Sequence, residues 1–400
     1  MVRAEGVYYP CDMIILDIIM QIIIFFKKIL LYIVRTIVIF ISRLLPLQNK
    51  VILDNFRGDG FGDDPKYIAQ ELSKEKGLKI IWCYMNKVNN YPSYITPVKT
   101  FSIKFFYHLC TSKVWVDNVR GTFWVKKRDK QFYIQTWHGT LSLKKVEKEA
   151  PTIPESWKTT SMRDGTLTDL MYTNNDFQKW KYENSFWYNG PVIKCDVPRV
   201  GILLNPPQKL KIEILNFFAI NDDSKIILYA PTFRQDHNMD AYMWNYERIL
   251  NELETKFGGH YVMLLRLHPR IAAKCSDIKY NSRIINATNY PDMQELLAIS
   301  DIEINDYSSS MFDFGVLKRP VFLFCKDLET YKNSDRGLEF DFEQLPFPVV
   351  QTEDAFVDAI RKFNISNYKE KVTSFYDSIG YKDTGKGADY LARIIIKHIK

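Results

Sequence analysis

The sequence predicts an α/β protein made of two doubly wound, Rossmann-like domains that face each other across a cleft. Beyond residue 50, short apolar runs alternate with helical stretches, which is typical of parallel sheets covered on both faces by helices. A proline-containing stretch, LNPPQK at 204–209, divides this alternation into two halves. We therefore expect a first domain over 50–205, a second domain over 210–385 and a C-terminal helix over 386–400.

The predicted strands are short and rich in β-branched and aromatic residues. In the first half they are KVILDNF, LKIIWCYM, KVWVDNV, QFYIQTWH, LMYTNN and PVIKCDVPR. In the second half they are SKIILYAPTFR, HYVMLLRLHP, SRIINATN, SDIEINDYS and RPVFLFC. Since ligands bind outside the carboxyl ends of the strands in such sheets, we expect the chemistry at the ends of these runs.

Composition excludes several classes of protein. The 400 residues are 46% hydrophobic and 25% charged, which suits two well-filled cores and is unlike a disordered chain. The net charge of +7 comes with no zinc-finger or RNA-binding signature, so we expect no nucleic-acid partner. The six cysteines have no metal-ligand or redox spacing, and Asp-x-Asp is absent from the sequence. We therefore expect neither a metal site nor a cofactor.

Residues 13–45 are intensely apolar, but polar residues interrupt them too often for a clean membrane span. On a helix these polar residues share one narrow stripe, because they are spaced by 4, 7, 7 and 7: Asp17, Gln21, Lys28, Arg35 and Ser42. A helix or helix pair over 1–46 that lies in an anionic membrane surface fits this pattern best. A spanning helix, or an apolar helix buried in the protein's own core or in a dimer seam, remains an alternative.

His138 stands at the end of the strand QFYIQTWH and is followed by Gly139, which lets the backbone turn sharply or approach a ligand closely. A lone histidine is more often a satisfied structural residue than a catalytic one. The stretch LLRLHPR adds Arg266 and His268, which are two apart on a strand and so share a face. A guanidinium and an imidazole at the end of a buried strand need an anion, and we expect phosphate rather than a structural ion pair.

The run INDYSSSMFDF places Ser308, Ser309 and Ser310 between a strand and a helix. One serine is enough to cap a helix, so three favour a diphosphate site, with Asp313 one turn later expected to contact a sugar hydroxyl. Thr232 and Arg234 follow another strand. In RGDGFGDDPKYIAQEL, Asp64 is expected to cap a helix; this glycine-rich turn matches no standard phosphate-binding fingerprint.

Together and in this order, DDPKYIAQEL, WHGT, YAPTFR, RLHP, DYSSSMFDF and KRP…Y…RGLEFD resemble the CDP-glycerol glycerophosphotransferase family of wall teichoic acid synthesis. The resemblance implies the two-domain GT-B fold and transfer of a polyol phosphate from CDP-glycerol, or CDP-ribitol, to a hydroxyl of an acceptor, with release of CMP. The acceptor would be a polyprenyl-diphosphate-linked saccharide or a polyol phosphate. The implied location is peripheral, on the cytoplasmic face of the cell membrane. The sequence does not decide between a monomer and a homo-oligomer.

By this resemblance His138 and His268 are the expected catalytic residues: His138 is the general base, and His268 contacts the diphosphate together with Arg266. The remaining residues are expected to bind substrate: Gly139, Thr140, Thr232, Arg234, Ser308, Ser309, Ser310, Asp313 and Arg336, the last on a closing loop. Two alternatives remain. One is a capsule glycosyltransferase of similar fold, and the other is a membrane adaptor with a catalytically dead transferase fold.

Overall fold

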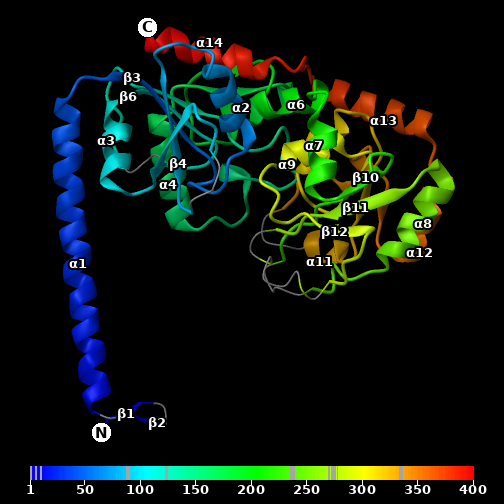
Figure 1. Ribbon diagram of the computed structural model, residues 1–400, viewed down its shortest axis with the longest axis horizontal. Helices are drawn as coiled ribbons and strands as arrows, with labels where there is room; N and C mark the ends of the chain where they lie inside the picture. Colours follow the sequence, from blue (N-terminus) through cyan, green and yellow to red (C-terminus); the bar gives the residue numbers. More distant parts are fainter. Residues whose placement is uncertain are drawn as a thin grey trace.

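The computed structural model shows two lobes and one long helix that stands away from them (Figure 1). It describes the chain except for residues 1, 5–6, 10, 87–90, 122–124, 235–238, 269–270, 272–275, 277 and 333–336, and it describes only the backbone of the remaining residues up to 18. Each lobe is built on a parallel sheet, as the sequence predicts. The stretch 204–209 lies between α6 (Gly201–Leu204) and α7 (Leu210–Phe217), on the path from the first sheet to the second.

The first sheet has the strand order β5-β4-β3-β6-β7, with all pairs parallel. Its strands are β3 (Gln48–Asp54), β4 (Lys79–Tyr84), β5 (Ile95–Lys99), β6 (Ser112–Asp117) and β7 (Phe132–Gln135). The lobe is completed by α2 (Asp63–Leu72), α3 (Ile103–Thr111), η1 (Glu147–Glu149), α4 (Glu155–Leu167), β8 (Met171–Thr173), α5 (Asp176–Asn184), β9 (Val192–Lys194) and η2 (Pro198–Val200).

The second sheet has the order β12-β11-β10-β13-β14-β15, again parallel. Its strands are β10 (Lys225–Tyr229), β11 (Tyr261–Leu265), β12 (Ile284–Asn286), β13 (Ile302–Asn305), β14 (Val321–Phe324) and β15 (Val349–Val350). Its other elements are α8 (Tyr246–Phe257), α9 (Met293–Ile299), α10 (Ser310–Gly315), α11 (Leu328–Lys332), η4 (Phe342–Gln344), α12 (Glu353–Lys362) and α13 (Ile365–Ser378).

In both sheets the strand order reverses direction beside the first strand in the chain, between β3 and β6 and between β10 and β13. The crevice at such a reversal, outside the carboxyl ends of the strands, is where doubly wound sheets bind ligands. The ends are level in the first sheet, where Asp54 pairs with Asp117. Each lobe therefore offers one such crevice.

In the two large sheets the sequence analysis missed β5 and β15, which are both edge strands. It also missed the antiparallel pair β1 (Val2–Ala4) and β2 (Val7–Tyr9), within the segment 1–46 that was expected to be helical. The β5 run ITPVK contains Pro97, which cannot donate to a sheet ladder and so weakens a strand prediction. The β15 strand has only two residues, too few for a recognisable alternation. The C-terminal helix α14 (Gly387–Ile399) returns to the first lobe, where Leu391 and Ile395 join the core around Ile68.

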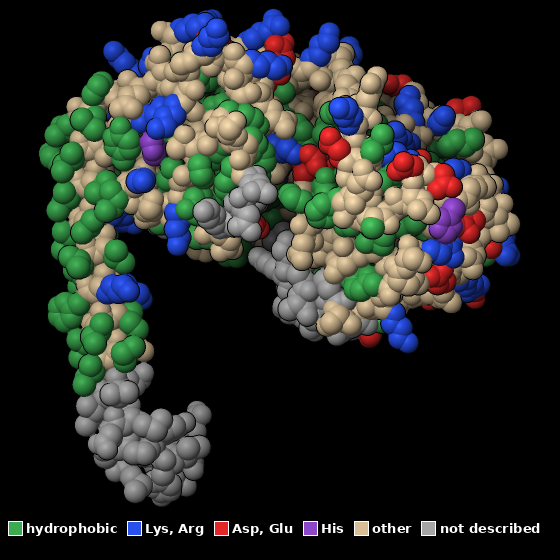
Figure 2. All heavy atoms as spheres, viewed as in Figure 1, with side chains coloured by type: hydrophobic (Ala, Val, Ile, Leu, Met, Phe, Trp, Pro, Cys, Tyr) green, Lys and Arg blue, Asp and Glu red, His purple; other side chains and the backbone are tan. Residues whose placement is uncertain are grey.

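The N-terminal segment is one continuous helix, α1 (Cys11–Leu44), rather than a pair. Its C-terminal part packs against α3: Val38 and Ile39 contact the core there, and the Arg43 guanidinium donates to the Lys126 carbonyl. Its N-terminal part stands clear of the body, and hydrophobic side chains cover most of its visible face (Figures 1 and 2). Among the described residues, no helix has both the length and the apolar character needed to cross a membrane.

Candidate active site between the two sheets

The first-sheet side of the site is built around His138, which follows the end of β7 by three residues. Its Nδ1 lies 2.8 Å from the carbonyl oxygen of Asn118. Because a carbonyl only accepts hydrogen bonds, Nδ1 carries the proton in this contact and the lone pair of the neutral ring lies on Nε2. The Trp137 backbone has φ 56°, an unusual conformation that turns the chain away from the strand just before the histidine.

The environment of His138 favours the neutral ring. Part of the imidazole is exposed, but protein surrounds the remainder, and this loss of water lowers the pKa of His138 below its ordinary value of 6.5. The cations Arg199 and Arg120 act in the same direction, while the hydrogen bond to Asn118 opposes them. A neutral imidazole with a free Nε2 can accept a proton near physiological pH.

Asn118, which the sequence analysis did not single out, holds this arrangement at the reversal between β3 and β6. Its side-chain amide donates to Asn55 Oδ1 (2.8 Å) and to Asp63 Oδ2 (2.9 Å). Its Oδ1 accepts from the backbone N–H of Phe56 (2.8 Å), and the Phe56 ring packs edge-on against His138 at 5.5 Å. The only available signal was the polar pair that follows each apolar strand, DN in both KVILDNF and KVWVDNV.

The structure brings the histidine segment of the first lobe against the serine segment of the second. A Cβ placed on Gly139 would lie 3.9 Å from the Cβ of Ser309. Ser309 precedes α10, yet its side chain makes no capping hydrogen bond. Helix capping, the simplest structural role for these serines, is therefore not the role of the Ser309 hydroxyl.

The flanking serines are tied to the protein. Ser310 Oγ donates to Glu303 Oε1 (2.8 Å) and accepts from the Asn305 amide (2.9 Å), while Ser308 Oγ accepts from the Ser310 backbone N–H (3.4 Å). Burial raises the pKa of Glu303 to about 8, so its carboxyl is mostly protonated at neutral pH. A neutral carboxyl places no fixed negative charge beneath the serines, which keeps this surface compatible with an anion.

Arg266 follows the end of β11, and its Nη1 donates to the Tyr290 carbonyl. Burial lowers its pKa, with Asp292 opposing that shift. Within the part of the chain that the structure describes, Arg266 has no carboxylate within ion-pair distance, unlike the structural ion pair that was the alternative prediction. His268 is exposed two residues later, with its ring 5.5 Å from that of Phe233.

Thr232 and Arg234, which were expected to bind substrate, contact carboxylates of the protein in this structure. Thr232 Oγ1 donates to Asp306 Oδ1 (2.7 Å). Arg234 pairs with Asp306 (2.8 Å) and with Asp327 (2.6 Å). These two side chains fix the loop between β13 and α10 rather than presenting free donors.

Asp313 and Thr140 also differ from expectation. Asp313 is buried and accepts from the Arg199 guanidinium (2.9 Å) and the Gln294 amide (3.0 Å), so its carboxylate faces protein donors and not an open sugar site. Thr140 is buried with it, and its hydroxyl accepts from Arg199 (3.2 Å). Arg336 lies outside the described residues.

Asp64 does not cap α2, because that helix begins at Asp63 after Gly62. Its carboxylate is instead buried, where it accepts from the Tyr172 hydroxyl (3.0 Å) and from the Arg199 backbone N–H (2.8 Å).

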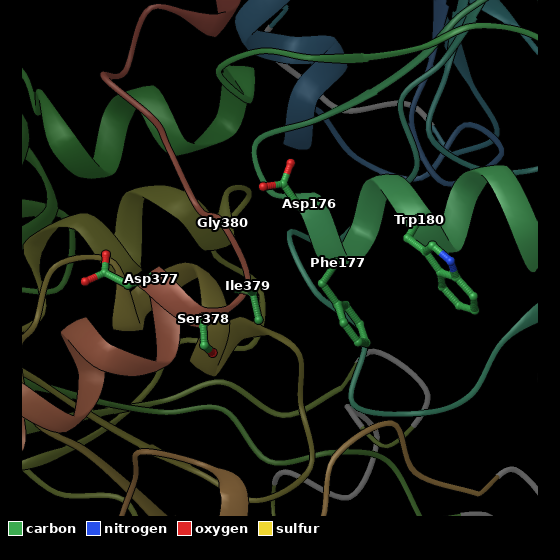
Figure 3. A pocket seen from close by; sticks show the side chains of 7 residues that line it. All are labelled: Asp176, Phe177, Trp180, Asp377, Ser378, Ile379 and Gly380. Atoms are coloured by element: carbon green, nitrogen blue, oxygen red, sulfur yellow. The ribbon is translucent and has the colours of Figure 1, made fainter.

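A separate pocket of about 390 Å³ opens where α5 meets the turn after α13 (Figure 3). It is lined by Asp176, Phe177, Trp180, Asp377, Ser378, Ile379 and Gly380, none of which the sequence analysis selected. The surface is also hollowed between the two lobes (Figure 2), and Gly139 of the first lobe approaches Ser309 of the second. We therefore assign the candidate site to the interlobe recess.

Comparison with known proteins agrees with this geometry. A family model described as CDP-Glycerol:Poly(glycerophosphate) glycerophosphotransferase matches residues 37–397. The teichoic acid poly(glycerol phosphate) polymerase of Bacillus spizizenii is 31% identical over 370 residues, which are 88% of this chain and 93% of that protein. The polymerase of the same name from Staphylococcus epidermidis is also 31% identical, over 88% of this chain, but the chain spans only 51% of its length.

Among solved structures, the wall teichoic acid polymerase TagF soaked with CDPG superposes with a TM-score of 0.82 at 28% identity, over 96% of this chain and 98% of that chain. The match covers both lobes, and the family match covers every described residue of the candidate site. This chain therefore belongs to the CDP-glycerol:poly(glycerophosphate) glycerophosphotransferase family.

Proposed function

We propose that this chain transfers glycerol phosphate from CDP-glycerol to a hydroxyl of a lipid-linked acceptor in teichoic acid synthesis, releasing CMP. The observation that carries the proposal is the approach of Gly139 to Ser309. This approach puts the segment of the neutral His138 in one lobe beside the serine segment of the other, where the Ser309 side chain makes no helix-capping hydrogen bond. Family membership and the relatives named as glycerol phosphate polymerases support the choice of donor.

In the proposed reaction the acceptor oxygen forms a bond to the β-phosphorus, and the bond from that phosphorus to the bridging oxygen breaks. CMP leaves with the electron pair of that bond, and Nε2 of His138 takes the proton of the attacking hydroxyl. Arg266, His268 and the hydroxyl of Ser309 are the groups we assign to the diphosphate. Phosphoryl transfer depends mainly on such positioning and charge stabilisation.

Incubation of the purified chain with a lipid-linked saccharide and one donor at a time tests the proposal by mass spectrometry. We expect CMP and a mass increase of one or more glycerol phosphate units with CDP-glycerol. Turnover with CDP-ribitol alone would replace glycerol by ribitol, and turnover only with nucleotide hexoses would overturn the proposal in favour of a glycosyltransferase. A membrane adaptor would turn over none of these donors, although it would have no use for an Arg266 that pairs with no carboxylate of the described residues.

We also propose that α1 holds the enzyme on the cytoplasmic face of the membrane as a peripheral protein. At its C-terminal end the polar stripe predicted from sequence turns toward the protein: Ser42 is buried, and the Arg35 guanidinium lies 5.9 Å from the centre of the Phe106 ring. Gln21 and Lys28, nearer the N-terminal end of the stripe, are exposed. Around the rest of the helix the surface is exposed and apolar, and its members are Ile19, Met20, Ile22, Ile23, Ile24, Phe25, Phe26, Ile29, Leu30, Leu31, Tyr32, Ile33, Ile37, Phe40, Ile41 and Leu44. So large an apolar surface is typical of a membrane-binding element.

The triple change Phe25→Glu, Phe26→Glu, Leu30→Glu tests this placement without touching the contacts of α1 with the body. Each side chain is at least 60% exposed and would contribute about 1.5–3 kcal/mol when buried in lipid, so we expect binding to vesicles of anionic phospholipid to weaken by about 10³-fold or more. Phe217→Glu, at a similarly exposed residue on α7, serves as the control and should leave cosedimentation unchanged. Persistence of the triple variant in the vesicle pellet would contradict the proposal.

A further inference from the structure

Arg199 lies on η2, at the end of the first lobe, and is only 2% exposed. Its guanidinium contacts carboxylates on both sides of the interlobe boundary. In the first lobe it lies 3.3 Å from Asp63 Oδ1 and 3.3 Å from Asp64 Oδ2. In the second lobe its Nε donates to Asp313 Oδ2 (2.9 Å) and its Nη2 to Asp313 Oδ1 (3.4 Å).

The same guanidinium also contacts the histidine segment. Its Nη2 donates to Thr140 Oγ1 (3.2 Å), and the Thr140 hydroxyl in turn hydrogen-bonds to Asp313. Thr140 is two residues after His138, and Asp313 is on α10, which begins at Ser310. The buried side chains of Thr140, Arg199 and Asp313 therefore form a continuous path of hydrogen bonds between the segment of His138 and the serine segment.

The charges around Arg199 keep this path rigid. Burial alone would raise the pKa of Asp313, but Arg199 outweighs that effect and holds the pKa of this carboxyl below its ordinary value. Asp313 is therefore ionised at neutral pH and bound by a guanidinium fork, the strongest type of side-chain hydrogen bond. A lysine could supply the charge but not the planar fork that reaches Thr140 and Asp313 together.

We propose that Arg199 is a positioning residue that sets the location of His138 relative to Ser308–Ser310 by binding Thr140 and Asp313 at once. The inference rests on the proposed function, in which the first lobe activates the acceptor and the second lobe holds the donor. Since a displacement of about 1 Å between reacting groups can cost about 10²-fold in rate, a fixed link between the lobes at this point would act mainly on the chemical step.

A second interlobe contact provides a matched control. Lys66 on α2 pairs with Asp292 (2.6 Å) and Glu295 (2.5 Å) of the second lobe and is buried like Arg199. It therefore joins the lobes, but it contacts neither the segment 138–140 nor α10 in the hydrogen bonds and ion pairs of the described residues. Lys66→Met weakens lobe attachment without altering the Thr140–Arg199–Asp313 link.

The test compares Arg199→Lys, Thr140→Val and Lys66→Met in the full chain, with CDP-glycerol as the donor. For Arg199→Lys we expect kcat to fall by about 10- to 100-fold with KM for CDP-glycerol within about threefold of wild type. Thr140→Val keeps the Arg199 contacts with Asp313, so we expect it to fold and to show a smaller loss of the same kind. Lys66→Met should lower thermal stability and leave kcat within about threefold of wild type.

Hydrogen exchange measured by mass spectrometry supplies a readout independent of catalysis. In Arg199→Lys and Thr140→Val we expect faster exchange at 136–142 and at 306–313 together, in different lobes, while Lys66→Met leaves both unchanged. Faster exchange confined to the first lobe, or equal kcat losses in Arg199→Lys and Lys66→Met, would overturn the inference. If wild type fails to turn over CDP-glycerol, the proposed function fails, but the exchange result still decides whether Arg199 links the two segments.

Discussion

Replacing His138 by Ala is expected to lower kcat for glycerol phosphate transfer by about 10²–10⁴-fold, the usual contribution of a positioned general base. The acceptor hydroxyl would lose the group that takes its proton, while the contacts assigned to the diphosphate would remain, so KM for CDP-glycerol should change little. CMP release under saturating acceptor measures the effect. An unchanged rate would remove His138 from the role of base.

The pH dependence gives a second measurement on the same residue. A base acts in its deprotonated form, so activity should rise with pH through the pKa of His138 and then become level. Because burial lowers that pKa, the midpoint of the rise in kcat/KM should lie below 6.5. The residual activity of His138→Ala should lack this rise. His260, which is exposed and pairs with Glu254, provides the matched control, since His260→Ala should keep both the rate and the profile of wild type.

Replacing Arg120 by Met is expected to destabilise the protein by about 3–5 kcal/mol, because it leaves two buried carboxylates without their partner. Arg120 is 1% exposed, lies 2.7 Å from Asp164 and 3.1 Å from Glu147, and its guanidinium lies 5.3 Å from the centre of the Trp137 ring. Chemical denaturation followed by far-ultraviolet circular dichroism measures the change in the free energy of unfolding. A change of less than about 1 kcal/mol would contradict this account of a buried ion cluster.

Arg393 is the control for this prediction, since it is 76% exposed and pairs with Asp389 one helical turn away. Exposed pairs of this kind contribute about 0.3–0.5 kcal/mol, so Arg393→Met should be close to neutral. The contrast separates the loss of an arginine from the loss of a buried charge partner. The Arg120→Met change should also affect the site. Trp137 contacts Arg120 and directly precedes His138, so loss of Arg120 would remove a contact that holds the turn before the proposed base.

The sequence predicted the two parallel sheets and the position of most strands because hydrophobic runs bounded by polar residues are a local signal. It also placed His138, Arg266 and the serines at strand ends; in the structure they lie in the segments that follow β7, β11 and β13, so Arg266 and His268 are beyond their strand and not on it. The edge strand β5 was missed because Pro97 interrupts its pattern, and Asp64 was read as a helix cap because its burial beside Arg199 and Tyr172 leaves no local mark.

What the sequence by itself determined is most of the strands, the chemistry available at their ends and the family to which the chain belongs. What only the tertiary structure decided is which charged groups are already paired. Arg199 and Asp313 are 114 residues apart and Arg234 and Asp327 are 93 apart, yet both pairs are close, whereas Arg266 contacts no carboxylate in the described part of the chain. The reason is physical: a residue type fixes its charge, but the neighbours that neutralise that charge come from distant segments and are set by how the two sheets meet.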